Sequence, residues 1–237
     1  MLAAAAVCPQ TPLLVTGMPV LAELRAACGA AVAGLLAARP DVLAVVGGAA
    51  DTAAYAGRAA GSLRPWGLRV TAGEGEPVLP LSLTVGRHLL GGQAPDACQA
   101  VAYDAAPAEC RALGEKLAAS GERVGLLVLA DGPACLTPRA PGRYDEAARP
   151  FDDLVAHALD TAAPGALAAL DPGEADRLWA TGRAALQVLA GAAGPEPFDG
   201  RLLARSAPFG VGYHAAVWTR RGTGTFIRSR ASTTSPS

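Results

Sequence analysis

The chain has 237 residues, of which 51% are hydrophobic and 17% are charged, and its formal net charge is -1. A chain of this length and apolar content can bury one large core, which excludes a largely disordered protein. The near-neutral charge, with no basic stripe, excludes nucleic acid as the main partner.

The chain has five cysteines, an odd number without a C-x-x-C pair. This pattern argues against a disulfide framework or a zinc knuckle and favours a reducing compartment. The opening MLAAAAVCPQTPLL lacks the basic region of a signal peptide, and its apolar run is too short to span a membrane. We therefore predict a cytoplasmic protein with no membrane partner.

Buried strands alternate with a helix in the first part of the chain. Leu2–Val7 and Val42–Val46 are short apolar runs that predict strands, and Leu21–Ala38 between them has its leucines at helical spacing. Short connections predict that the two strands run parallel. Residues 57–80 are rich in Gly and Pro, and we predict an irregular excursion with one strand near Leu68–Thr71.

The most informative stretch of the second part is Val124–Leu136 (VGLLVLADGPACL), in which a short apolar run ends at Asp131-Gly132-Pro133. Such a run indicates a strand buried on both faces, and we place the central strand at Arg123–Ala130. The other predicted elements are helices at Leu81–Leu90, Pro107–Ser120, Phe151–Leu159 and Pro172–Ala190, a strand at Cys98–Tyr103, a loop at Pro138–Arg149, and a terminal hairpin of Arg201–Ala207 with Val211–Thr219.

These elements predict one α/β domain over residues 1–230, with a mixed central β-sheet flanked by helices on both faces, followed by a disordered tail over residues 231–237.

Polar residues follow three of the predicted strands. Ligands of open α/β sheets bind beyond the carboxyl ends of the strands, so these residues are the pocket candidates. They are Gln10 and Thr11 after the first strand, Asp51 and Thr52 after the second, and Asp131, Cys135 and Thr137 after the central strand. Asp and Gly are common in turns whatever their function, so the alternative is a set of ordinary turn residues.

Several common site types have no matching motif. The chain contains no G-x-G-x-x-G, no G-x-x-x-x-G-K-[ST] and no G-x-S-x-G. Cys135 could act as a nucleophile with a distant histidine, but no neighbouring residue marks it as a thiolate. His88, His157 and His214 fall in separate predicted elements without metal-ligand spacing, so the residue pattern predicts no metal site.

Three segments resemble the catalytic B subunits of class III extradiol ring-cleavage dioxygenases and the related Memo-like proteins. The segments are AAAVCPQTPLL, LADGPACLTPRAPGRYDEAARPFDDLVAHAL and GVGYHAAVW. The chain is similar over nearly its whole length to a divergent actinobacterial branch of this family. The resemblance implies the family fold and a non-haem iron(II) held by two histidines and one carboxylate. A catechol and oxygen would meet at this iron while a further histidine moves protons.

The chain departs from the family pattern at the positions that carry this chemistry. Gln10 or Cys8 stands where the resemblance expects the first histidine, Asp51 stands at the second, and Cys135 replaces the histidine that follows Asp131. Loss of both imidazoles removes the donors that hold iron(II). We therefore expect no cofactor, or iron(II) if the family activity is retained.

Two functional hypotheses follow. The favoured one is a pseudo-enzyme, a binding or scaffolding protein that keeps the pocket without oxygen chemistry. The alternative is an active oxidoreductase of the extradiol dioxygenase family with an altered metal site around Gln10, Asp51, Asp131 and Cys135. Asp131 and Cys135 are the catalytic candidates, and a small-molecule ligand and a homo-oligomer are the partners left open.

Two expectations concern stability. We expect Asp131 to be buried at the pocket mouth and to accept hydrogen bonds from loop amides, so that Asp131→Asn lowers stability. We expect Cys135→Ser to be nearly silent in folding and in any assay.

Overall fold

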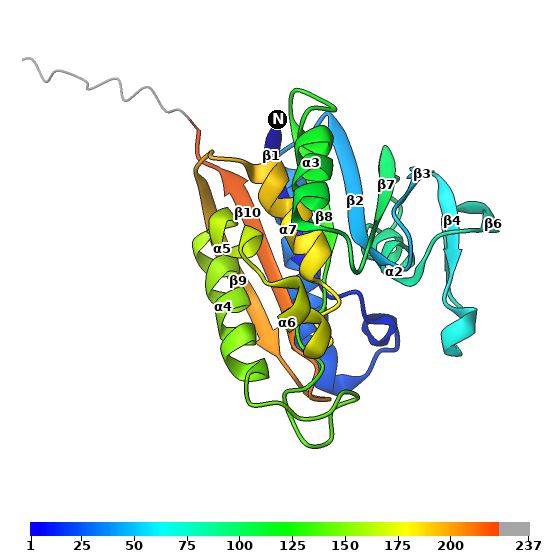
Figure 1. Cartoon of the computed structure of the whole chain (residues 1–237). Coiled ribbons are helices and arrows are strands. Elements are labelled where there is room, and N and C mark those ends of the chain that lie inside the picture. The colour runs from blue at the N-terminus through cyan, green and yellow to red at the C-terminus, as the bar shows by residue number, and fades with distance from the viewer. Residues whose placement is uncertain (223–237) are drawn as a thin grey trace, which may run out of the picture.

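The centre of the molecule is a seven-stranded mixed sheet with the order β3-β7-β2-β8-β1-β10-β9 (Figure 1). The computed structural model describes residues 1–222. Strands β7, β2, β8 and β1 run parallel, whereas β3, β10 and β9 each run antiparallel to a neighbour. The strands are β1 (Leu2–Cys8), β2 (Val42–Ala49), β3 (Ala53–Ala56), β7 (Ala97–Ala102), β8 (Val124–Leu129), β9 (Phe198–Ser206) and β10 (Tyr213–Arg220).

Helices cover both faces of this sheet, so the predicted α/β architecture is confirmed. Alternate residues of β8 enter different cores, with Leu126 and Val128 on one face and Leu127 and Leu129 on the other. The first face carries α3 (Pro107–Ala118), α4 (Ala148–Thr161), α5 (Pro164–Ala168), α6 (Pro172–Arg177) and α7 (Arg183–Ala193), and the second carries α1 (Ala22–Ala37) and α2 (Leu81–Leu89). Figure 1 shows α3 and α7 crossing the front of the sheet.

Strand β8 occupies the middle of the sheet, between β1 and β2. Every residue of Val124–Leu129 is buried, which is why the segment is apolar throughout instead of alternating with polar residues. β1 and β2 are parallel as predicted, but the chain inserts β8 between them only after α3. The carboxyl ends of β1, β2, β7 and β8 therefore meet at one edge of the sheet.

The excursion over residues 57–80 has more structure than the sequence predicts. Three short strands, β4 (Ala59–Ser62), β5 (Thr71–Ala72) and β6 (Glu74–Pro77), form a second small sheet in the order β5-β4-β6. Gly73 has a φ of 91°, and a Cβ there would lie 2.2 Å from the carbonyl oxygen of Ala59. Only glycine permits this approach between strands, and the local sequence pattern does not reveal it.

The prediction of one helix over Pro172–Ala190 is wrong, because the segment breaks into α6 and α7. Gly182, in the break, donates its N–H to the carbonyl oxygen of Asp131 at 2.9 Å. A Cβ on Gly182 would lie 2.5 Å from that same oxygen, so a glycine is needed for the contact. The end of the central strand thus contacts the break, and Trp179 and Thr181 in the break line the same cavity as Asp131. Helix α5 was not predicted.

Other short elements complete the described chain. Three 3-10 turns lie at Pro12–Val15, Pro19–Leu21 and Arg64–Trp66. The helical stretch Pro19–Ala37 is long and apolar enough to cross a membrane by length and composition, but Leu24, Cys28 and Leu35 on it are buried against the sheet. The predicted tail, residues 231–237, and the end of the predicted domain, residues 223–230, lie outside the described residues.

Candidate functional site

A cavity of about 690 Å³ opens at the edge of the sheet where the parallel strands end. Its size and its mostly apolar walls are those of small-molecule sites. Tyr103 and Asp104 follow β7, Asp131 follows β8, and Tyr213 begins β10. The α6 segment and the break before α7 close the other side with Pro172, Gly173, Ala175, Asp176, Trp179, Ala180, Thr181 and Arg183, and Ala134 and Val211 complete the lining.

Asp131 joins three of the elements around this cavity. Its Oδ1 accepts a hydrogen bond from the N–H of Gln10 at 3.0 Å, and the Gln10 side chain donates from Nε2 to Thr181 Oγ1 at 2.7 Å. Its backbone also forms an isolated bridge with Tyr213. The structure therefore brings together the loops after β1 and β8, as expected for neighbouring parallel strands.

Thr11 lies beside this group but has a local task. It is buried, and its hydroxyl accepts a hydrogen bond from the N–H of Leu13 at 3.3 Å, which caps the 3-10 turn Pro12–Val15. Thr11 does not line the cavity, but its side chain also forms a hydrogen bond with the cavity-lining Tyr213. Burial raises the pKa of Tyr213, and this hydrogen bond lowers it by a smaller amount.

The structure does not bring Asp51 and Thr52 to the cavity. Both are exposed, and Thr52 Oγ1 accepts from the N–H of Ala102 on the neighbouring strand at 2.9 Å. The ring of Tyr103 occupies the space beyond β2, because a Cβ on Gly48 would lie only 2.5 Å from Tyr103 Cε1. Because Gly48 has no side chain, the Tyr103 ring packs against the end of β2. The sequence pattern had placed Asp51 and Thr52 at this point of the cavity.

Cys135 lies in the hydrophobic core and not on the cavity. The residue is 1% exposed, and the Gly142 backbone packs against its sulfur. Burial raises the pKa of the Cys135 thiol, the nearby Asp145 carboxylate raises it further, and Arg177 opposes both. A buried thiol with a raised pKa is a poor nucleophile. Thr137 lies in a different surface cavity, beside Pro138 and Phe209.

Asp131 has the most perturbed carboxyl group of the cavity. Burial of the carboxyl raises its pKa to about 7, against the opposing effect of the hydrogen bond from Gln10 N–H. Burial also raises the pKa of Tyr103 and of Tyr213, and the Asp131 charge raises both further. Near neutral pH, Asp131 therefore exchanges between a hydrogen-bond donor and a charged acceptor, as groups at functional sites commonly do.

Sequence reasoning missed the aromatic part of the cavity. Tyr103 and Asp104 come directly after a predicted strand, so the strand-exit rule that selected Asp131 could have selected them. Trp179 carries no comparable sequence signal. It is 55% exposed and has a φ of 53°, a backbone region that bulky residues rarely adopt.

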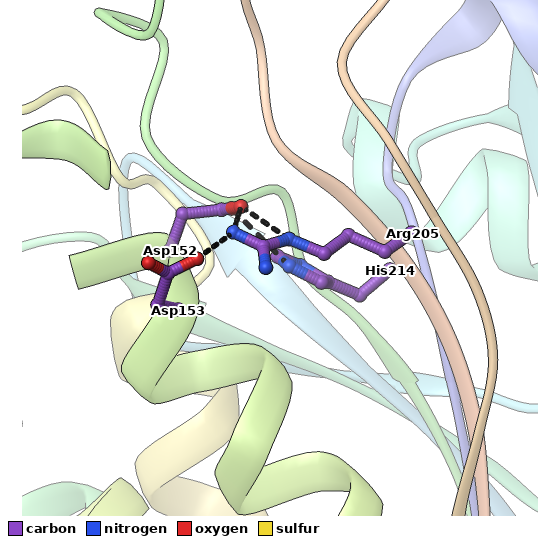
Figure 2. Close-up of polar contacts among 4 residues, drawn as sticks. All are labelled: Asp152, Asp153, Arg205 and His214. Atoms are coloured by element: carbon purple, nitrogen blue, oxygen red, sulfur yellow. Dashed lines mark hydrogen bonds and ion pairs between the residues drawn. The ribbon is translucent and has the colours of Figure 1, made fainter. Parts of the chain in front are cut away.

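A second polar cluster lies near the cavity and consists of Asp152, Asp153, Arg205 and His214 (Figure 2). Buried Asp152 accepts hydrogen bonds from Nε of Arg205 at 2.7 Å and from its Nη2, and Arg205 also contacts Asp153. Nε2 of His214 lies 3.2 Å from Asp152 Oδ1, an electrostatic contact whose angle falls outside hydrogen-bond geometry. Burial opposes ionisation of Asp152, but His214 and Arg205 outweigh it and lower its pKa.

Two glycines separate this cluster from Asp131. Gly132 and Gly212 form backbone hydrogen bonds across the loops, from Gly132 N–H to Gly212 O at 2.7 Å and from Gly212 N–H to Pro133 O at 2.9 Å. A Cβ on Gly212 would lie 2.2 Å from Asp152 Oδ1. The segments DGP, FDD and GVGYH thus meet at one point.

The described residues do not fit a site of two histidines and one carboxylate. Residues 1–222 contain no group of three or more His, Cys, Asp or Glu side chains that could hold a metal ion. His88 lies in α2, His157 lies in α4 and His214 contacts Asp152, and none of them lines the cavity. The imidazole donors that iron(II) requires are therefore missing from the Asp131 cavity.

Comparison with known proteins identifies the fold alone. No family model and no curated protein matches the chain. A solved structure, the uncharacterized protein JW3007 from Escherichia coli K12, matches with a TM-score of 0.50 and 15% sequence identity, over 92% of this chain and 99% of that one. At this identity the likeness extends to the arrangement of helices and strands and not to the site.

Proposed function

We propose that the chain is a relative of the catalytic subunits of class III extradiol dioxygenases that binds a small molecule in the Asp131 cavity and does not cleave aromatic rings. One observation carries the proposal. Gln10, which with Cys8 is one of the two residues that could stand where the resemblance expects the first ligand histidine, donates its backbone N–H to Asp131 and its side-chain amide to Thr181. A residue at a position where the resemblance expects a ligand is thus held by hydrogen bonds beside the cavity, which supports binding without a histidine-ligated iron.

The chemistry of the Gln10 side chain supports the loss of ring cleavage. A carboxamide is a much weaker donor to iron(II) than an imidazole. The Gln10 nitrogen is already engaged by Thr181 Oγ1, which fixes the orientation of the amide. The two thiol candidates, Cys8 and Cys135, are both buried in the hydrophobic core and cannot replace the missing histidine.

The alternative is an active oxidoreductase with an altered metal site, and one observation favours it. Oε1 of Gln10 is buried and accepts no hydrogen bond from the described residues, so an acceptor oxygen is left without a donor. A metal ion could satisfy this oxygen. The alternative also needs Asp51 and Cys135 as donors, however, and both lie away from the cavity, so we favour the binding protein.

Iron loading tests the proposal. We expect protein that is purified anaerobically and mixed with ferrous iron to retain substoichiometric iron after desalting. We also expect no yellow ring-cleavage product with catechol or protocatechuate. Gln10→Ala is the matched control, because it should leave both results unchanged if Gln10 is not a ligand. Stoichiometric iron that depends on Gln10, together with a cleavage product, would establish the oxidoreductase instead.

A further inference from the structure

We infer that the ligand of the Asp131 cavity is an organic cation, an ammonium group carried on an aromatic or other apolar body. The inference rests on the proposed small-molecule binding and specifies the chemistry of the ligand. It follows from the charges, the hydrogen-bonding groups and the aromatic walls of the cavity.

The cavity has carboxylates without cationic partners. Asp104, Asp131 and Asp176 all line it, and none of the three forms an ion pair with any residue in the described part of the chain. Other acidic residues nearby are paired, since Asp145 and Glu174 both contact Arg177. A positively charged ligand would supply the counter-charge that the protein does not.

Arg183 is the one cationic side chain among the lining residues; both of its terminal nitrogens donate hydrogen bonds within the protein, and its Nε is buried without an acceptor among the described residues. It is 3% exposed, and Nη1 donates to the carbonyl oxygen of Ala105 at 2.6 Å and to Gln187 Oε1 at 3.0 Å. Nη2 donates to the carbonyl oxygen of Tyr103 at 2.7 Å. Arg183 therefore ties α7 to the end of β7 and does not offer a free guanidinium to an anionic ligand.

Two acceptor oxygens, one on the cavity-lining Asp131 and one on Gln10 behind it, receive no hydrogen bond from the described residues. Asp131 receives one hydrogen bond, at Oδ1, and none of the described residues donates to its Oδ2. Gln10 is 5% exposed, its amide nitrogen reaches the cavity-lining Thr181, and its Oε1 has no donor. Buried acceptors without donors are costly, so a ligand that brings N–H groups is favoured over one that brings oxygens.

The walls suit the apolar part of such a ligand. Tyr103, Trp179 and Tyr213 line the cavity, together with small apolar residues such as Ala134 and Val211. Aromatic faces attract ammonium groups, with tryptophan the strongest. The exposed indole of Trp179 is held by a strained backbone at the cavity, where a ligand could cover it.

A bare metal ion fits these features less well than an organic cation. The three aspartates do not form a group with metal-ligand spacing, and the cavity of about 690 Å³ is far larger than an ion. Aromatic acids fit poorly as well, because their carboxylates would approach the unpaired aspartates.

Calorimetric titration with three probes of similar size tests the inference. The probes are benzylamine, benzyl alcohol and benzoate, used at about pH 8, where Asp131 is mostly ionised. We expect benzylamine to bind roughly tenfold more tightly than benzyl alcohol, and benzoate to bind most weakly. Benzylamine should also change the fluorescence of the wild-type protein, and this change should be lost in Trp179→Phe.

Charge-neutral variants show whether the carboxylates are responsible. The double variant Asp104→Asn/Asp176→Asn should lower benzylamine affinity about tenfold and leave benzyl alcohol affinity unchanged. Glu174→Gln on the same short helix is the matched control, because Glu174 is paired with Arg177 and does not line the cavity. It should change neither affinity.

Each other outcome overturns a specific claim. Equal binding of the three probes, or tightest binding of benzoate, would refute the cation and leave small-molecule binding in place. If no probe binds, the inference also fails, and the iron and catechol experiment then decides separately on the proposed function.

Discussion

Asp131 and Asp152 lie on either side of the Gly132–Gly212 contact, yet their surroundings have opposite effects on their charge. Asp131 has one backbone hydrogen bond and no cationic partner, and burial raises its pKa to about 7. Asp152 is buried too, but Arg205 and His214 contact it and its pKa is lowered. Burial alone therefore does not set the protonation state, because the partners decide whether the charged form is stabilised.

The difference separates a structural cluster from a candidate binding group. Asp152 joins α4 to β9 and β10 through its contacts with Arg205 and His214, so its charge is neutralised within the fold. Asp131 is left without such a partner and lines the cavity. A carboxyl group that the fold leaves unpaired is free to respond to a ligand or to pH.

The largest expected loss of stability comes from Asp152, the carboxylate that has ionic partners. Asp152→Ala should lower the free energy of unfolding by about 3 kcal/mol, because it leaves Arg205 and His214 without their buried partner. The side chain of Arg205 is 29% exposed, which keeps the loss at the lower end of the range for buried pairs. Urea denaturation near neutral pH measures it.

Asp153→Ala is the matched control, since Asp153 contacts the same arginine from a side chain that is 55% exposed. Its cost should stay below about 1 kcal/mol. Equal losses in the two variants would mean that Asp152 is no more important to the cluster than a surface charge.

The second expected effect is a pH dependence of the free energy of unfolding, caused by the unpaired carboxyl group of Asp131. A raised pKa in the folded state means that Asp131 lowers wild-type stability as pH rises from about 4 to about 7. Asp131→Asn keeps an acceptor for Gln10 N–H and removes this loss. The variant should match the wild type at about pH 4 and exceed it by on the order of 4 kcal/mol at about pH 8.

This expectation replaces the one from sequence, which assumed a charged carboxylate bound by several loop amides. The structure provides one amide, from Gln10. Asp152 should behave in the opposite way, since its lowered pKa contributes stability above about pH 4 that is lost as pH falls. A variant less stable than the wild type at every pH would restore the original expectation for Asp131.

The smallest effect concerns Cys135, which belongs to neither region. Cys135→Ser should cost about 1 kcal/mol, because it places a hydroxyl group in the hydrophobic core. Because Cys135 lies in the core, we now expect a measurable loss of stability where the sequence predicted a nearly silent variant. Thermal unfolding measures the cost, and benzylamine affinity should not change. Loss of binding in a folded variant would instead place Cys135 in the site.

The residue pattern was enough to predict the class of fold and one corner of the cavity. Val124–Leu129 is apolar throughout because it is buried on both faces, and that pattern is local enough to be visible in the chain. The sequence also selected Gln10 and Asp131 as strand-exit residues, and they meet because Leu2–Cys8 and Val124–Leu129 are parallel neighbours in the structure.

Contacts between distant segments determine which residues complete the site and how they are charged. The break at Gly182 exists because the end of β8 approaches it, and Tyr103 covers the end of β2 because Gly48 leaves room. Asp131 follows a strand and Asp152 lies in a helix, and neither local pattern shows that Asp131 lacks a cationic partner whereas Asp152 has Arg205, far along the chain. Burial and charge pairing of this kind arise only in the tertiary structure, and a local pattern of residue types does not encode them.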